Sequence, residues 1–336
     1  MFFLLNILIV LTWPIYSKIN SKKHSYIDEQ IELLNLSNED LVILNNETWK
    51  NYDKFRFVPF TGHSETNRVG KFVNFSESDG RKVNRPQNCN KNIYLYGGST
   101  TFGYNVTDAQ TIGQSLQDLL GDNHCVFNHG RAYYYSKQEN NLFINHLETG
   151  KKIDTAFFLD GINERCGGYE YMNQINNSFT LYVERPYLMW KISFKNFILT
   201  LPVVQFSNSL FGSNRWIHDN NNNILQVDTC TSKKSLGELY ESRILVRDSI
   251  CKKFDIKCYS ILQPMVGNHG IQIKKLLSKD KEKIFQEKYK ILSSATGFID
   301  LGFVFDNDNS LSYIDGVHYS PISNKKIASE LYKYLN

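Results

Sequence analysis

Residues 93–103 read IYLYGGSTTFG, a short apolar run followed by two glycines and a serine. A short apolar run bounded by turn residues is typical of a strand that is buried on both faces of a sheet. Comparable runs occur at residues 126–127, 156–159, 259–262 and 298–301. We therefore expect a sheet of buried strands.

Helical patterns separate these runs. They lie near residues 111–120, 137–149, 236–254 and 322–335, and the last has Ser320 as an N-cap with Pro321 at the first helical position. Alternation of strands and helices predicts a parallel sheet covered by helices on both faces. The predicted fold class is α/β, a three-layer α/β/α sandwich with a central parallel sheet.

Polar residues follow several of the predicted strands. They are Ser99 after the first, Asn128-His129-Gly130 after the second, Asp160-Gly161-Ile162-Asn163-Glu164 after the third, and Asp315-Gly316-Val317-His318 before the final helix. Each group alone is explained by a turn, a helix cap or a local hydrogen bond. Ligands bind at the carboxyl ends of parallel strands, so the four groups together predict one site.

This order of motifs, GGSTTFG, NHG, DGINE and DGVH, resembles the four blocks of the SGNH (GDSL-type) hydrolase superfamily, over roughly residues 90–336. The resemblance implies a flavodoxin-like strand order. It also implies a serine esterase with Ser99 as nucleophile, His318 as general base and Asp315 as the carboxylate that orients it. The oxyanion hole would comprise the N–H groups of Ser99 and Gly130 and the amide of Asn163.

Two positions depart from the family pattern. Gly98 stands where the family has Asp, and Glu164 stands where the third block usually has Asp. The residue two after Ser99 is Thr101, so the G-x-S-x-G elbow of α/β-hydrolases is absent, as are a phosphate-binding P-loop and an H-E-x-x-H motif. No cofactor and no metal site are implied.

The substrate is left open by the sequence. Residues 165–235 are rich in aromatic residues and are expected to form an insertion that caps the site, and Tyr133, Tyr169 and Trp190 are candidate substrate-binding residues. The aromatic residues could instead form the core of the insertion or contact a membrane surface. We expect an acyl ester, with an O-acetyl group on a carbohydrate favoured. The alternatives are an O-acyltransferase acting on a glycan with the same residues, and a catalytically idle glycan-binding protein.

The N-terminal third divides into three predicted segments. Residues 1–17 suit a signal peptide or an N-terminal anchor, residues 18–50 a linker, and residues 51–88 a small accessory segment; the hydrolase domain would span residues 89–336. An exported or membrane-anchored protein on the extracytoplasmic side is therefore expected. The apolar N-terminal segment could also associate with a membrane.

Six cysteines and a small net charge complete the picture. In an exported chain the cysteines could pair, with Cys89 and Cys125 as one candidate pair and Cys166 and Cys230 as another, although free buried thiols are equally compatible. The net charge of +4 comes from interleaved Lys and Glu and provides no basic field for nucleic acid. The expected partner is a small-molecule or glycan ester.

Overall fold

A computed structural model describes residues 27–50, 55–166, 234–269, 271–272, 279–306 and 310–335. The sheet and its helices belong to one of the two units into which the chain divides, formed by residues 28–168 and 227–336. Apart from Ile27, the other unit, residues 1–27 and 169–226, lies outside the described residues. Within the part of the chain that the structure describes, no helix is long and apolar enough to cross a membrane.

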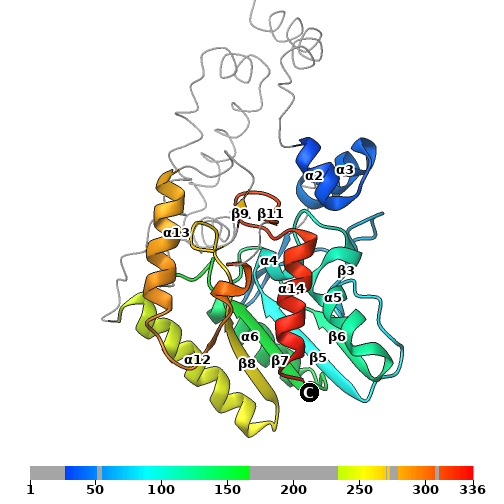
Figure 1. The fold of residues 1–336 in the computed structure, drawn as a ribbon. Helices are drawn as coiled ribbons and strands as arrows, with labels where there is room; N and C mark the ends of the chain where they lie inside the picture. Colours follow the sequence, from blue (N-terminus) through cyan, green and yellow to red (C-terminus); the bar gives the residue numbers. More distant parts are fainter. Residues whose placement is uncertain are drawn as a thin grey trace, which may run out of the picture. The chain divides into compact units, whose positions relative to one another are not determined.

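A seven-stranded sheet forms the centre of the molecule, in the order β10-β8-β7-β5-β6-β4-β3 (Figure 1). Its strands are β3 (Phe75–Ser76), β4 (Gly80–Arg81), β5 (Lys91–Gly97), β6 (His124–Asn128), β7 (Thr155–Asp160), β8 (Lys257–Leu262) and β10 (Ile299–Asp300). All neighbouring pairs are parallel except β3 with β4. Counted along the chain from β5, the strands β5, β6, β7, β8 and β10 lie in the order 2-1-3-4-5, the flavodoxin-like order that the family resemblance implies.

Helices cover both faces of the sheet, so the predicted three-layer sandwich is confirmed. Tyr94 and Phe158 face α6 (Ser136–Glu148) and α12 (Leu236–Lys253) and form an apolar core with them. Side chains alternate along a strand, so Leu95 and Phe157 point to the opposite face. There α5 (Ile112–Leu120) packs on β6 and against α14 (Pro321–Tyr332).

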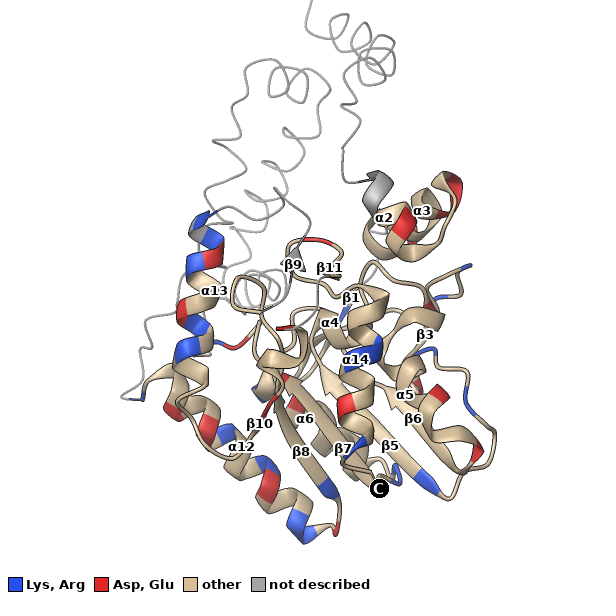
Figure 2. Cartoon of the chain, in the orientation of Figure 1, with Lys and Arg blue, Asp and Glu red and all other residues tan. Residues whose placement is uncertain are grey.

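The helix starts follow the sequence signals. Ser320 caps α14 by accepting a hydrogen bond from the Ser323 N–H at 3.3 Å, with Pro321 at the first helical turn as predicted. Thr111 caps α5 in the same way. Lys residues alternate with Asp and Glu along α13 (Lys279–Leu292), which gives this helix a face of mixed charge (Figure 2).

Shorter elements complete the described chain. They are η2 (Asp108–Gln110), η3 (Gly121–Asn123), η5 (Gly302–Phe305), the hairpin β1 (Phe55–Val58) with β2 (Gly62–Glu65), and the parallel pair β9 (Ile271–Gln272) with β11 (Leu311–Tyr313).

The segment predicted as a linker, residues 18–50, is different where the structure describes it. Residues 27–50 form α2 (Ile27–Leu34), α3 (Asn38–Asn45) and the π-helical turn η1 (Asn46–Lys50). Leu34, Leu41 and Leu44 are buried, because these leucines recur at helical spacing among the polar residues that suggested a linker. The Gln30 side chain also donates to the Ile314 carbonyl at 3.0 Å, so the segment is packed on the body of the protein.

The segment 51–88, predicted as a small accessory segment, contributes two short strands to the sheet. Its strands β3 and β4 extend the main sheet next to β6. These strands have two residues each, too short for a period-two pattern to reveal them in the sequence.

Two disulfides lie within the described chain. Cys89 pairs with Cys125, as one of the two candidate pairings has it, with Cα atoms 5.6 Å apart. Cys251 pairs with Cys258, a bond that the sequence did not suggest. Cys166 is also disulfide-bonded, whereas Cys230, its predicted partner, lies outside the described residues.

Candidate active site

Ser99 lies where strand β5 turns into the single-turn helix α4 (Ser99–Phe102). Gly98 is the N-cap, and Gly103 ends the helix in the left-handed conformation at φ +89°. A Cβ atom on Gly98 would lie 2.5 Å from the Asn163 amide nitrogen, so a side chain there would displace the Asn163 amide from its present position.

His318 lies on the loop that joins β11 to α14. The loop is closed by a hydrogen bond from the Ile314 N–H to the His318 carbonyl at 2.8 Å. Its imidazole Nε2 is 2.9 Å from Ser99 Oγ, within hydrogen-bond distance. The base is therefore placed to take the serine proton.

Asp315 completes a line of hydrogen bonds that starts at Ser99. Its Oδ2 lies 2.6 Å from His318 Nδ1, and its Oδ1 accepts from the N–H groups of Val317 and His318, both at 2.7 Å. A carboxylate on Nδ1 holds the imidazole in the tautomer whose Nε2 is free to accept a proton. Ser99, which lies more than 200 residues before the Asp315–His318 pair, thus stands in the order that a nucleophile, a base and an orienting acid require.

The pKa of Asp315 is lowered from its ordinary value. Burial acts in the opposite direction and is the largest single effect, but the charge of His318, with the hydrogen bonds from His318 and Val317, outweighs it. The carboxylate therefore remains ionised well into the acid range.

The three predicted oxyanion donors lie around the same turn. Asn163 lies beside Gly98 and donates one amide hydrogen to the Tyr134 carbonyl at 3.0 Å, which leaves its second hydrogen for a ligand. The Ser99 N–H is in the first turn of α4, whose N–H groups have no partner within the helix. The Gly130 N–H donates to Asn128 Oδ1 at 3.1 Å in this structure.

The backbone around Gly130 leaves no room for a side chain. A Cβ on Gly130 would lie 2.3 Å from the Phe102 nitrogen and 2.7 Å from the Thr101 carbonyl carbon. Gly130 is thus required for close packing against the backbone of the helix that carries Ser99.

Glu164, the second departure from the family pattern, contacts the start of a neighbouring helix. Its carboxylate accepts from the Ser136 N–H at 2.7 Å and the Ser136 hydroxyl at 2.8 Å, and it pairs with Arg243 at 3.0 Å. It thereby binds the first turn of α6. Burial raises its pKa, and Arg243 acts against that rise.

Sequence reasoning missed three residues beside the triad. The Tyr104 ring stacks on the His318 ring with centroids 5.5 Å apart. The Trp49 ring contacts the same His318 ring edge-on, with centroids 5.9 Å apart. Asn105 donates from Nδ2 to Asp315 Oδ2. The turn residues of the sequence Gly103-Tyr104-Asn105 gave a weak signal for Asn105, and nothing in the sequence marked Trp49.

The candidate substrate-binding residues are only partly described. Tyr133 is 41% exposed, and its carbonyl accepts from Arg165 at 3.0 Å. Tyr169 and Trp190 lie outside the described residues, as does nearly all of the predicted insertion 165–235.

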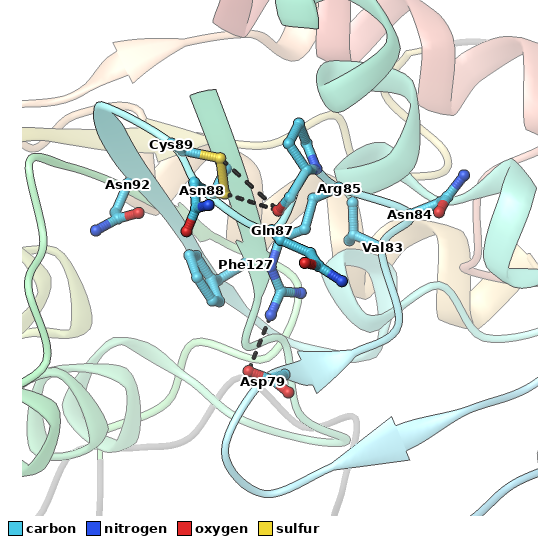
Figure 3. A pocket seen from close by; sticks show the side chains of 11 residues that line it. Asp79, Val83, Asn84, Arg85, Gln87, Asn88, Cys89, Asn92 and Phe127 are labelled. Carbon is cyan, nitrogen blue, oxygen red and sulfur yellow. Dashed lines mark hydrogen bonds and ion pairs between the residues drawn. A yellow bond between two sulfur atoms is a disulfide. The ribbon is translucent and has the colours of Figure 1, made fainter. Parts of the chain in front are cut away.

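A separate open pocket of about 600 Å³ lies near the amino ends of β5 and β6 (Figure 3). Arg85 extends over the Phe127 ring at 4.1 Å and pairs with Asp79 at 2.9 Å, and the Cys89–Cys125 disulfide forms part of the wall. Ser99, Asp315 and His318 do not line this pocket.

Comparisons with known proteins gave the following. No family model matches the chain, and no curated protein matches it. Solved structures similar to it include an acetyl xylan esterase (13% identity, covering 73% of this chain and 100% of that one, TM-score 0.38) and a carbohydrate acetylesterase family member from Sinorhizobium meliloti (13%, 73% and 97%, 0.37). An aryl esterase from M. smegmatis is also similar (13%, 73% and 98%, 0.39).

Proposed function

We propose that the protein is a serine esterase that cleaves acyl esters at Ser99. The observation that carries the proposal is the unbroken hydrogen-bonded line from Ser99 Oγ through His318 to Asp315, at 2.9 Å and 2.6 Å. A serine hydroxyl is a weak nucleophile unless a base removes its proton, and this geometry supplies the base.

The reaction would proceed in two halves. Ser99 Oγ attacks the acyl carbon while His318 Nε2 takes its proton, and the imidazolium then passes that proton to the departing alcohol oxygen, which leaves an acyl-serine. Water attacks this acyl group, gives a proton to His318 and releases the carboxylic acid, after which Ser99 recovers its proton.

Charge develops on the acyl oxygen in both halves. The N–H groups of Ser99 and Gly130 and the free amide hydrogen of Asn163 are proposed to stabilise it. One such donor contributes on the order of 10²–10³ in rate. The Gly130 N–H would have to exchange Asn128 Oδ1 for the substrate oxygen.

The alcohol half of the ester is proposed to be a carbohydrate and the acyl group an acetyl, as the family resemblance implies. An extracytoplasmic location is part of the proposal. The disulfides Cys89–Cys125 and Cys251–Cys258 support it, since such bonds persist in oxidising compartments.

The test is active-site labelling of the purified full-length protein with a fluorophosphonate probe. We expect stoichiometric labelling that Ser99→Ala and His318→Ala abolish. Two variants serve as controls and should label normally. Ser249→Ala changes an exposed helical serine, and His269→Ala changes a histidine outside the triad that lies 2.7 Å from Asp306. An unlabelled wild-type protein, or labelling that survives Ser99→Ala, would refute the proposal.

Release of acetate from acetylated xylan, measured with and without a free sugar acceptor, then addresses the substrate. Acetate release that is unaffected by the acceptor supports hydrolysis. Acetyl groups recovered on the acceptor would identify a transferase that uses the same residues.

A further inference from the structure

Asp315 is held by a residue that lies far from it in sequence. Asn105 Nδ2 donates to Asp315 Oδ2, the same oxygen that accepts from His318 Nδ1. With the Val317 and His318 N–H groups on Oδ1, the carboxylate accepts four hydrogen bonds. That number fills its acceptor capacity, so the carboxylate can take only one orientation.

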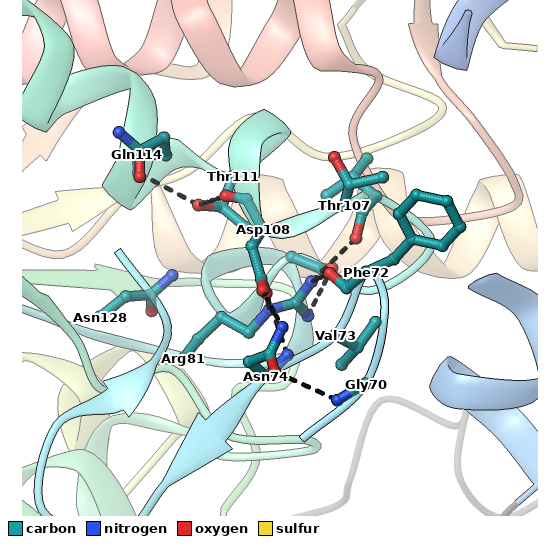
Figure 4. Close-up of polar contacts among 12 residues, drawn as sticks. Gly70, Phe72, Val73, Asn74, Arg81, Thr107, Asp108, Thr111, Gln114 and Asn128 are labelled. Atoms are coloured by element: carbon teal, nitrogen blue, oxygen red, sulfur yellow. Dashed lines mark hydrogen bonds and ion pairs between the residues drawn. The ribbon is translucent and has the colours of Figure 1, made fainter. Parts of the chain in front are cut away.

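The backbone around Asn105 has a fixed conformation. It adopts the left-handed conformation at φ +63°, which Asn tolerates better than other non-glycine residues. The buried Arg81 guanidinium donates to the carbonyls of Gly103 at 3.3 Å and Val106 at 2.9 Å, on either side of the Tyr104–Asn105 pair. Figure 4 shows Arg81 between Asp108, its ion-pair partner, and the Phe72 backbone.

The other end of the Asn105 amide is bound by Trp49. The indole N–H of Trp49 donates to Asn105 Oδ1, which fixes the amide so that its NH₂ group faces Asp315. Trp49 belongs to η1, and Glu47 in the same turn accepts from the N–H groups of Lys71, Phe72 and Val73 at 2.7, 2.8 and 2.9 Å. The N-terminal segment is thus held at two further places, by Glu47 at the 71–73 backbone and by Gln30 at the Ile314 carbonyl.

We infer that Trp49 and Asn105 are positioning residues of the active site, which extend the triad into a relay Trp49–Asn105–Asp315–His318–Ser99. This inference rests on the proposed esterase function. It makes Trp49, near the end of the N-terminal segment 27–50, a support of the Asp315 carboxylate. Neither residue touches the serine; both act through Asp315.

The relay has a predictable electrostatic effect. The Asn105 N–H partly neutralises the negative charge on Asp315 Oδ2. Without this hydrogen bond, more negative charge would face the His318 ring and would stabilise its protonated form. The described groups against the His318 ring are Asp315, Ser99, Tyr104 and Trp49. Burial raises the pKa of Tyr104, so that ring stays neutral. Loss of the Asn105 amide is therefore expected to move the acid limb of the pH–rate profile to higher pH.

Three variants of the full-length protein test the relay. Asn105→Gly removes the amide without strain, because glycine accepts φ +63°. Asn105→Asp keeps the shape but replaces the donor with a charge, and Trp49→Phe keeps the ring but removes the N–H. We expect Asn105→Gly to lower kcat/KM by about 10- to 100-fold, the worth of a hydrogen bond to a charged group. KM should change little, and the acid limb should shift upward.

The other two variants bracket this result. Asn105→Asp should shift the acid limb further than Asn105→Gly, and Trp49→Phe should give a smaller effect in the same direction. The matched control is Asn35→Gly. Asn35 also has a left-handed backbone conformation, but it is an exposed residue of the N-terminal segment, so this variant should keep wild-type kinetics. Circular dichroism confirms that each variant is folded.

The outcomes separate the two proposals. If the wild-type protein is labelled by the fluorophosphonate but Asn105→Gly and Trp49→Phe keep its labelling rate and pH profile, the relay is wrong and the esterase assignment stands. A loss of activity with an unchanged pH profile would also reject the relay, since it indicates a structural role alone. An unlabelled wild-type protein defeats the esterase assignment, and the relay loses its basis with it.

Discussion

At the scale of single residues, packing constrains the glycines of this site more than the chemistry does. Gly98 leaves room for the Asn163 amide, and Gly130 leaves room for the backbone of α4. Both contacts fix the position of Ser99, because α4 begins at that residue. Oxyanion donors act only when they are already in place, so this packing is a precondition of the proposed catalysis.

Gly130→Ala should separate packing from conformational strain. The new Cβ would force α4 to move, because the Phe102 N–H is bonded to the Gly98 carbonyl at 3.0 Å. We expect a loss of about 1–3 kcal/mol in the free energy of unfolding. A displacement of Ser99 by about 1 Å would lower kcat on the order of 10²-fold. Urea unfolding and steady-state kinetics measure the two effects.

Gly150→Ala is the control for this prediction. Gly150 has φ +76° and open space around its Cβ position, so alanine meets strain but no clash. It should cost about 1–2 kcal/mol and leave kcat unchanged. Equal kcat values for Gly130→Ala and wild type would contradict the packing argument.

At the scale of elements, disulfides and buried polar contacts join the helices to the sheet. Cys89–Cys125 connects the approaches to β5 and β6, and Cys251–Cys258 connects the end of α12 to β8. Arg247 of α12 pairs with Asp160 at the end of β7 at 2.8 Å, with both side chains buried. The disulfides thus tie the amino ends of the strands, and the Arg247–Asp160 pair holds the carboxyl end of β7, after which Asn163 follows.

The two disulfides should differ in their contribution to stability. Their sequence separations are 36 and 7 residues. In the chain-entropy model, closing the longer loop is worth about 4 kcal/mol and closing the shorter about 2 kcal/mol. The double variants Cys89→Ala/Cys125→Ala and Cys251→Ala/Cys258→Ala, compared by urea unfolding, measure this difference. A larger loss from the second pair would show that loop entropy does not set the order.

At the scale of the whole molecule, three layers enclose ionisable groups that water cannot reach. His129 follows β6 and His146 lies on α6, with ring centroids 4.3 Å apart. Burial, with a smaller effect from neighbouring positive charges, lowers the pKa of His129 well below its usual value and that of His146 to about 3. Both imidazoles are therefore neutral in the folded protein.

Stability should consequently fall as the pH is lowered. Between about pH 6.5 and the lowered folded-state values, the unfolded chain binds protons on these two histidines and the folded chain does not. The free energy of unfolding should decrease by up to about 2.7 kcal/mol per pH unit in this range. Urea unfolding from pH 7.5 to pH 5 measures the slope. His146→Gln should remove about half of it, and an unchanged slope would show that His146 is not buried in the neutral form.

The sequence by itself predicted the layered fold, and its family resemblance singled out Ser99, His318 and Asp315. Strand and helix patterns are local, so residues 93–97 and 112–120 carry their own signals. Once the strands are parallel, their carboxyl ends meet at one edge, so Ser99 and Asn163, which follow two of these strands, are expected at the same edge. The Ser320-Pro321 start of the last helix was equally local.

Only the tertiary structure revealed what surrounds the triad. Trp49 and Asn105 are 56 residues apart in the sequence, and Asn105 and Asp315 are 210 apart, and no periodicity links such positions. The helices of residues 27–50 read as a linker because their buried leucines are outnumbered by polar neighbours. A local pattern indicates which residues can do chemistry, whereas long-range packing decides which atoms hold them in place.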